Sequence, residues 1–174
     1  MAHIAKVLED AGYSTFLPQR DGLEFARVLP DLATALGTQA EVQDVLARAV
    51  FSLDVYQLLS VSDAVVANLN GRVPDEGTVV EAALAWYAGK ALVLYKSDER
   101  SLMLGSDNPM LRGLADFQYV QEVETIPDRI AAALDTQSDA EQVVAMGAQV
   151  ARALSQQQGG PGLARDLLRL TRGG

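Results

Sequence analysis

The residue with the clearest chemical potential in this sequence is Glu81, in the first turn of a predicted helix over 78–88. It is the only charged residue between Thr78 and Gly89, in a segment that is apolar on every side, as is typical of a buried helix. The positive end of the helix dipole stabilises a carboxylate there, and the ionised form is the nucleophilic one. The pattern therefore marks Glu81 as a candidate catalytic nucleophile.

A helix cap explains the same spacing equally well. Thr78 and Glu81 form a Thr-x-x-Glu capping box, in which the threonine hydroxyl accepts a hydrogen bond from the Glu81 amide and the glutamate side chain accepts one from the Thr78 amide. The two roles are compatible only if the Glu81 side chain turns towards a ligand. The sequence leaves both roles open.

Two more polar residues lie on the predicted loop over 70–77. Ligands of an open α/β sheet bind beyond the carboxyl ends of its strands, so Asn70, Asp75 and Glu81 are expected to face one crevice. Asp75 precedes Glu81 by six residues, and on a loop it can serve as a proton donor. A solvated loop aspartate is the alternative reading of Asp75.

The elements that must position these residues alternate between helix and strand. The nearly continuous apolar run over 64–69 predicts a strand covered on both faces, and with 78–88 and 91–95 it predicts a βαβ unit. Further predictions are helices over 4–12, 41–60 and 127–134, strands over 13–17 and 117–120, a loop over 19–22, and a loop over 23–40 with a weak helix at 32–36.

This alternation predicts an α/β fold with a doubly wound parallel sheet, flavodoxin-like or Rossmann-like. Chains of this class usually begin with a strand that becomes central, whereas the first element here is a helix, so the usual first strand is expected to be lacking. Residues 1–135 are interpreted as the α/β domain and 136–174 as a C-terminal helical extension. A docked or fraying helix is favoured for the extension over a recognition element.

Composition narrows the function classes. The net charge of −9 argues against a polymeric nucleic-acid partner, and the lack of cysteine excludes disulfides and thiolate chemistry. The single histidine, His3, is expected at the surface, so no metal and no cofactor are predicted. The longest apolar stretch, 79–88, is too short to span a bilayer, and no signal pattern precedes it. A cytoplasmic protein without a membrane partner is expected.

Several motifs together resemble one enzyme family. The stretch over 62–71, then 75–78, Glu81 and 87–90, looks like the signature of nucleoside 2-deoxyribosyltransferases in order and spacing. The segments over 16–22, 95–98 and 108–110 also resemble family segments, so that the similarity covers roughly residues 4–134.

The resemblance implies roles for individual residues. Glu81 would attack C1′ of the deoxyribose, Asp75 would contact the base and help it leave protonated, and Asp54 would be a further active-site carboxylate. Asn108 would reach the sugar 5′-hydroxyl in a neighbouring subunit, which implies a homo-oligomer. The substrate-binding residues implied are Asn70, Gly71, Gly77 and Asn108. A surface aspartate at position 54 and a turn at Asn108-Pro109 are the alternatives.

The implied activity is cleavage of the N-glycosidic bond of 2′-deoxynucleosides, through a covalent glycosyl-glutamate intermediate, with transfer of the sugar to another free base. A hydrolase of deoxynucleoside 5′-monophosphates and a non-catalytic nucleotide-binding protein are the alternatives. Two departures matter: Asn70 stands where relatives have aspartate, and the first strand is lacking. If the native polypeptide starts at Met1, the pocket is expected to be incomplete.

Overall fold

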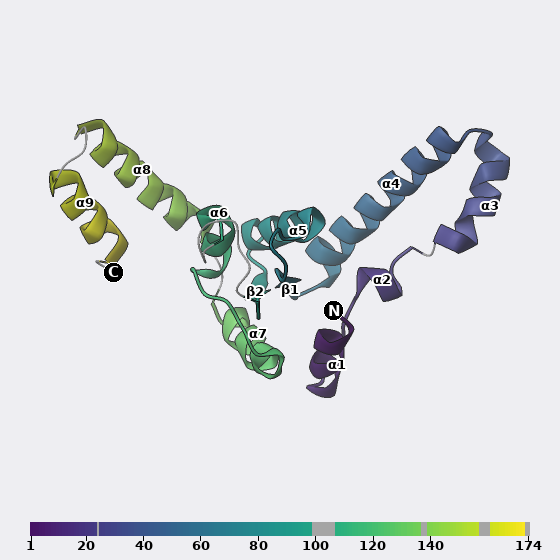
Figure 1. Ribbon diagram of the computed structural model, residues 1–174, viewed down its shortest axis with the longest axis horizontal. Helices are drawn as coiled ribbons and strands as arrows, with labels where there is room; N and C mark the ends of the chain where they lie inside the picture. Colours follow the sequence, from purple (N-terminus) through teal and green to yellow (C-terminus); the bar gives the residue numbers. More distant parts are fainter. Residues whose placement is uncertain (24, 99–106, 137–138, 157–160, 173–174) are drawn as a thin grey trace. The chain divides into compact units, whose positions relative to one another are not determined.

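The computed structural model describes residues 1–23, 25–98, 107–136, 139–156 and 161–172 (Figure 1). The chain divides into two compact units, Met1–Gln137 and Ser138–Gly174. None of the described helices is long and apolar enough to cross a membrane.

The first unit is organised around a parallel pair of strands. Strand β1 (Ala64–Asn68) pairs with β2 (Ala91–Tyr95), with Ala64 opposite Ala91. Helix α5 (Glu76–Tyr87) connects them, so the predicted βαβ unit is confirmed. A single parallel bridge joins Tyr95 to Val120 on the other side of β2. A mixed α/β fold is therefore confirmed, while the larger doubly wound sheet stays a prediction.

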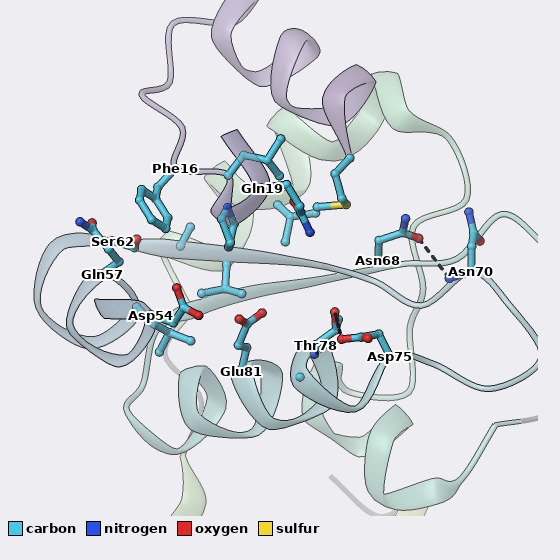
Figure 2. Close-up of a pocket in the computed structure, with 18 residues that line it drawn as sticks. Phe16, Gln19, Asp54, Gln57, Ser62, Asn68, Asn70, Asp75, Thr78 and Glu81 are labelled. Carbon is cyan, nitrogen blue, oxygen red and sulfur yellow. Dashed lines mark hydrogen bonds between the residues drawn. The ribbon is translucent and has the colours of Figure 1, made fainter. Parts of the chain in front are cut away.

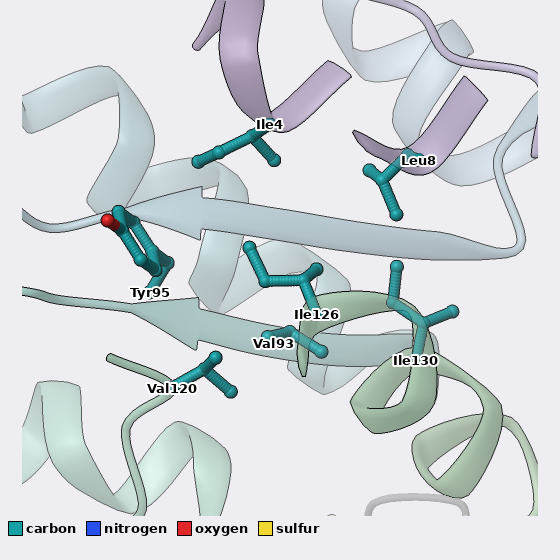
Figure 3. Close-up of a cluster of buried hydrophobic side chains, with 7 residues drawn as sticks. All are labelled: Ile4, Leu8, Val93, Tyr95, Val120, Ile126 and Ile130. Atoms are coloured by element: carbon teal, nitrogen blue, oxygen red, sulfur yellow. The ribbon is translucent and has the colours of Figure 1, made fainter. Parts of the chain in front are cut away.

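Helices cover both faces of this pair because successive side chains of a strand point to opposite faces. On one face, α1 (Ala2–Asp10) and α7 (Ile126–Leu134) pack on β2 in a buried cluster (Figure 3). This cluster consists of Ile4, Leu8, Val93, Tyr95, Val120, Ile126 and Ile130. On the other face, α5 and α6 (Pro109–Arg112) enclose Ala67, Leu69, Ala82, Leu94 and Leu111.

A long helical segment leads into β1. Helix α3 (Phe25–Leu36) packs against α4 (Gln39–Tyr56), whose first turn is capped by the Thr38 hydroxyl. The π-helical turn η1 (Gln57–Val61) extends α4 towards β1. Three short helical turns complete the unit: α2 (Pro18–Asp21), η2 (Gly113–Ala115) and η3 (Val123–Thr125).

The second unit contains α8 (Ala140–Gln156) and α9 (Pro161–Arg172), which contact each other. Both helices lie within the extension predicted over 136–174, so its helical character is confirmed.

Two predicted strands are wrong. Residues 13–17 form no strand, because a strand needs a paired neighbour and the backbone at Leu17 bonds instead to the turn of α2. Residues 117–120 pair only at Val120, because Asp116 and Phe117 adopt left-handed φ angles of 49° and 61° and turn the chain.

Two predicted loops are helical instead. The loop over 23–40 is mostly α3, which accommodates Pro30 inside the helix, and the loop over 19–22 falls largely within α2. Pro18 opens α2 at the first helical position, where a missing backbone N–H costs nothing. The two prolines favoured loops in the sequence-based prediction, whereas in the structure Pro18 begins a helix and Pro30 lies within one.

Candidate functional site

A cavity of about 510 Å³ lies along β1, between the start of α5, the end of α4 and residues 16–19 (Figure 2). Carboxylates from two helices reach it: Asp54 from α4, and Asp75 and Glu81 from the start of α5. Its other polar lining side chains are Gln19, Gln57, Ser62, Asn68, Asn70 and Thr78. The structure thus brings together the three predicted catalytic residues.

Glu81 is not part of a capping box. Helix α5 starts at Glu76, and its cap is Asp75, whose Oδ1 accepts from the Thr78 amide at 3.0 Å and from the Thr78 hydroxyl at 3.4 Å. The predicted Thr78 cap is therefore wrong, because the aspartate three residues earlier takes that role. Glu81 then lies in the second turn, and its carboxylate forms no hydrogen bond or ion pair within the described part of the chain.

The environment of Glu81 disfavours its negative charge. Burial raises the pKa of the Glu81 carboxyl, and the nearby charges of Asp54 and Asp75 raise this pKa further. Burial also raises the pKa of the Asp54 carboxyl. No lysine or arginine is among the described residues that line the cavity. Raised carboxyl pKa values in a cavity are a common property of catalytic sites.

This arrangement suits a reaction in which positive charge develops on the ligand. A carboxylate can stabilise such charge or form a covalent bond with it, and a carboxyl with a raised pKa can donate a proton. Within the described residues, no group of three or more histidine, aspartate or glutamate side chains has the arrangement of a metal site.

Asn70 lines the cavity and also holds two loops together. Its Oδ1 accepts from the amides of Ser97 at 2.8 Å and Asp98 at 3.3 Å, and its Nδ2 donates to the Ser97 hydroxyl at 3.0 Å. An ionised aspartate at this position has no N–H to donate. The amide therefore fits the contact between the loops that follow β1 and β2.

Lys96 also holds together the loops that follow β1 and β2. The sequence analysis did not identify it. Only 5% of its side chain is exposed, and its Nζ donates to the carbonyl oxygens of Leu69 at 3.1 Å and Gly71 at 3.3 Å. The ammonium also lies 3.5 Å from Asp98 and 3.6 Å from Asp107. The available signal was a lysine directly after a strongly apolar strand.

Gly71 and Gly77 have different surroundings. Gly77 lines the cavity, and a Cβ atom there would lie 3.1 Å from the capping oxygen of Asp75. Gly71 is next to Asn70 but is not a lining residue; its φ of +117° favours glycine, and its amide donates to Asp98 at 2.8 Å.

Asn108 does not join the site. It caps α6 by accepting a hydrogen bond from the Met110 amide at 2.9 Å, and it is exposed. It is not one of the residues that line the cavity. Within this chain the residue therefore starts a turn, and its contact with a neighbouring subunit stays a prediction.

Comparison with known proteins gives one family. The model of the family described as nucleoside 2-deoxyribosyltransferase matches residues 1–153 of the 174-residue chain. The matched region contains the whole cavity and extends into α8. No curated protein is a significant match.

Replacing Lys96 with methionine is expected to lower the free energy of unfolding by about 3–5 kcal/mol, because it removes a buried ammonium group that lies beside two carboxylates and donates to two backbone carbonyl oxygens. Urea denaturation followed by the fluorescence of Trp86, the only tryptophan, measures this change. Lys6→Met is the matched control, since the ion pair of Lys6 with Asp10 is exposed and its loss should have no measurable effect. Equal losses of unfolding free energy in the two variants would contradict a stabilising role for the buried Lys96 ammonium.

Glu81→Gln is expected to stabilise the fold at pH 7. The pKa of the Glu81 carboxyl is raised in the folded state above its ordinary value of 4.5. The folded state therefore loses stability as the pH rises from 4.5 through the folded-state pKa, because the carboxyl ionises more readily in the unfolded chain. The variant should therefore unfold at a higher urea concentration than the wild type at pH 7, and the difference should vanish below about pH 4. A variant less stable than the wild type at pH 7 would show that the Glu81 charge is favourably paired.

Proposed function

Because this chain belongs to the nucleoside 2-deoxyribosyltransferase family, we propose that it cleaves the N-glycosidic bond of 2′-deoxynucleosides and transfers the sugar to another base. The observation that carries the proposal is the position of Glu81. Its carboxylate faces the cavity beside Asp54 and Asp75, and no hydrogen bond from the described residues occupies it.

The proposed reaction proceeds in two displacements. The Glu81 carboxylate attacks C1′ while the bond from C1′ to the base nitrogen breaks, the electron pair leaves with the base, and an acid protonates the base. A nitrogen of a second base then attacks C1′, the bond from C1′ to the Glu81 carboxylate breaks, and the proton lost by that nitrogen returns to the deprotonated acid. Deoxyribose has no 2′-hydroxyl to withdraw electrons, so positive charge develops readily at C1′ in the transition state.

The crowding of carboxylates supports this route. Formation of the glycosyl ester removes the negative charge of Glu81, which relieves its repulsion by Asp54 and Asp75. Before the ester forms, the charge of Asp54 stabilises the positive charge that develops on the sugar. We assign base protonation to Asp75, since its Oδ1 caps α5 while no hydrogen bond to Oδ2 is present among the described residues.

The lining of the cavity favours a neutral nucleoside over a nucleoside 5′-monophosphate. The dianionic phosphate would be repelled by the three carboxylates of the described lining, which includes no lysine or arginine side chain to offset that repulsion. The monophosphate hydrolase is therefore the second candidate. Asn108 lies outside the cavity, so its proposed contact with the sugar 5′-hydroxyl requires a neighbouring subunit in a homo-oligomer.

Incubation with deoxyinosine, with and without adenine, tests the activity directly by chromatography. The proposal expects deoxyadenosine and hypoxanthine to form when adenine is present. Hypoxanthine without deoxyadenosine would indicate hydrolysis, and base release only from deoxyinosine monophosphate would favour the second candidate. No base release from a folded sample with any deoxynucleoside or deoxynucleotide would contradict both and leave a non-catalytic protein.

Glu81→Ala and Glu81→Gln are each expected to reduce the transfer rate on the order of 10³-fold or more, because neither side chain can form the glycosyl ester. Glu76→Gln is the matched control, since Glu76 is exposed on the same helix and does not line the cavity. Transfer at the wild-type rate in Glu81→Ala would show that another group is the nucleophile.

Substitutions of Asp75 separate its two roles. Asp75→Asn should keep the cap of α5 and the stability of the fold, yet lower the transfer rate by roughly 10²–10⁴-fold through loss of the acid. Asp75→Ala should lose the acid and also about 1 kcal/mol of stability with the cap. Urea denaturation and the deoxyinosine assay measure the two effects. A fully active Asp75→Asn would restrict the role of Asp75 to the cap.

A further inference from the structure

Helix α8 carries its large apolar side chains on one side. In a helix that packs against other helices, apolar residues recur alternately three and four positions apart. This pattern runs along α8 without interruption, through Ala140, Val143, Gly147, Val150 and Leu154. The glutamate, glutamine, arginine and serine residues of α8 fall outside this pattern. Helix α8 is therefore built to bury one face.

Helix α9 covers only part of that face. The two helices form a hairpin, in which three leucines of α9 are half-buried: Leu163, Leu167 and Leu170 (Figure 1). Helix α8 itself buries only Ala153. More than half of each of three large apolar side chains of α8 is exposed: Val143, Val144 and Leu154. An apolar face thus remains open beside α9.

The second unit is too short to fold around a core of its own. It spans Ser138–Gly174, and domains shorter than about 40 residues usually need a disulfide, a metal or a partner chain. The sequence has no cysteine, and its only histidine is His3, so disulfides and the usual zinc ligands are lacking. A protein surface is therefore expected to cover the open face of α8.

Gly147 lies in the middle of this open face. Glycine in the interior of a helix is less stable than alanine, and a Cβ atom added here would meet nothing within 4 Å in the single chain. The fold of one chain therefore does not require glycine at this position. Glycine does allow another backbone to approach closely, and its neighbours along the face, Ala140 and Ala151, are also small.

We propose that the open face is covered by α8 of a second copy of the chain, packed antiparallel across a two-fold axis at Gly147. Two α8–α9 hairpins then form a four-helix bundle, with both open faces in its core. This contact is separate from the one proposed for Asn108. It does not depend on the transferase activity.

Two charged residues beside the open face favour this partner and this orientation. Glu141 and Arg152 are exposed, and they lie about three helical turns apart on the same flank of α8. Neither forms an ion pair within the described part of the chain. In an antiparallel pair centred on Gly147, each Glu141 lies beside Arg152 of the partner subunit. A parallel pair would instead bring like charges together, which is unfavourable.

The mass of the full chain, measured by light scattering after size-exclusion chromatography, tests the contact. Val144→Glu is expected to halve the wild-type mass, because it places two carboxylates in an apolar interface. Val144 is 70% exposed in the single chain, so the substitution should leave the free energy of unfolding of one chain unchanged. Ala145→Glu is the matched control, since Ala145 is exposed and lies outside the apolar face, and it should keep the wild-type mass.

Two results of this measurement would overturn the proposal. One is a wild-type protein with the mass of a single chain. The other is a Val144→Glu variant with the wild-type mass. If that variant also unfolds at a lower urea concentration, the face is covered by the first unit of the same chain instead.

Charge reversal tests the orientation. Glu141→Arg and Arg152→Glu each bring two pairs of like charges together in the antiparallel dimer. Each should raise the dissociation constant about tenfold at low salt, as measured by sedimentation equilibrium. The double variant restores opposite charges and should recover the wild-type dissociation constant. A double variant that dissociates as readily as either single variant would overturn the antiparallel contact.

Discussion

The parallel pairing of Ala64–Asn68 with Ala91–Tyr95 sets where Asn70, Asp75 and Glu81 of the candidate site lie. Because the strands are parallel, both end at the same edge of the sheet, and helix α5 must begin there. Asn70 and Lys96 then tie the loops that follow the two strands, through contacts that exist only in this register. The positions of Asp75 and Glu81 follow from this edge.

At that edge, one aspartate changes the role of a neighbouring glutamate. Asp75 caps α5 by accepting a hydrogen bond from the Thr78 amide, which is the amide that a capping-box Glu81 would have bonded. The Glu81 carboxylate is directed into a half-buried cavity with two other carboxylates, where burial and like charge raise its pKa. In the proposed reaction, formation of the glycosyl ester on Glu81 would remove this unfavourable charge.

The sequence predicted what short-range patterns determine. The βαβ unit from 64 to 95, the helices at both ends of the chain and the gathering of Asp54, Asp75 and Glu81 were all read from periodicity, strand ends and family motifs. Residues 13–17 have a strand-like composition, but strand formation depends on a neighbour that local sequence does not supply. The cap was misassigned because Asp75 and Thr78 are both competent caps, and only the start of the helix decides between them. Lys96 was missed because its partners Leu69, Gly71 and Asp107 are distant from it in the sequence.

The most direct test of the role of Glu81 is the mass of the protein quenched in acid during turnover of deoxyinosine, followed by peptide mapping. A transferase that uses Glu81 as its nucleophile predicts a gain of one deoxyribosyl group, located on the peptide that contains Glu81 and absent from Glu81→Ala. Turnover without any such adduct, or an adduct on a different carboxylate, would contradict this assignment.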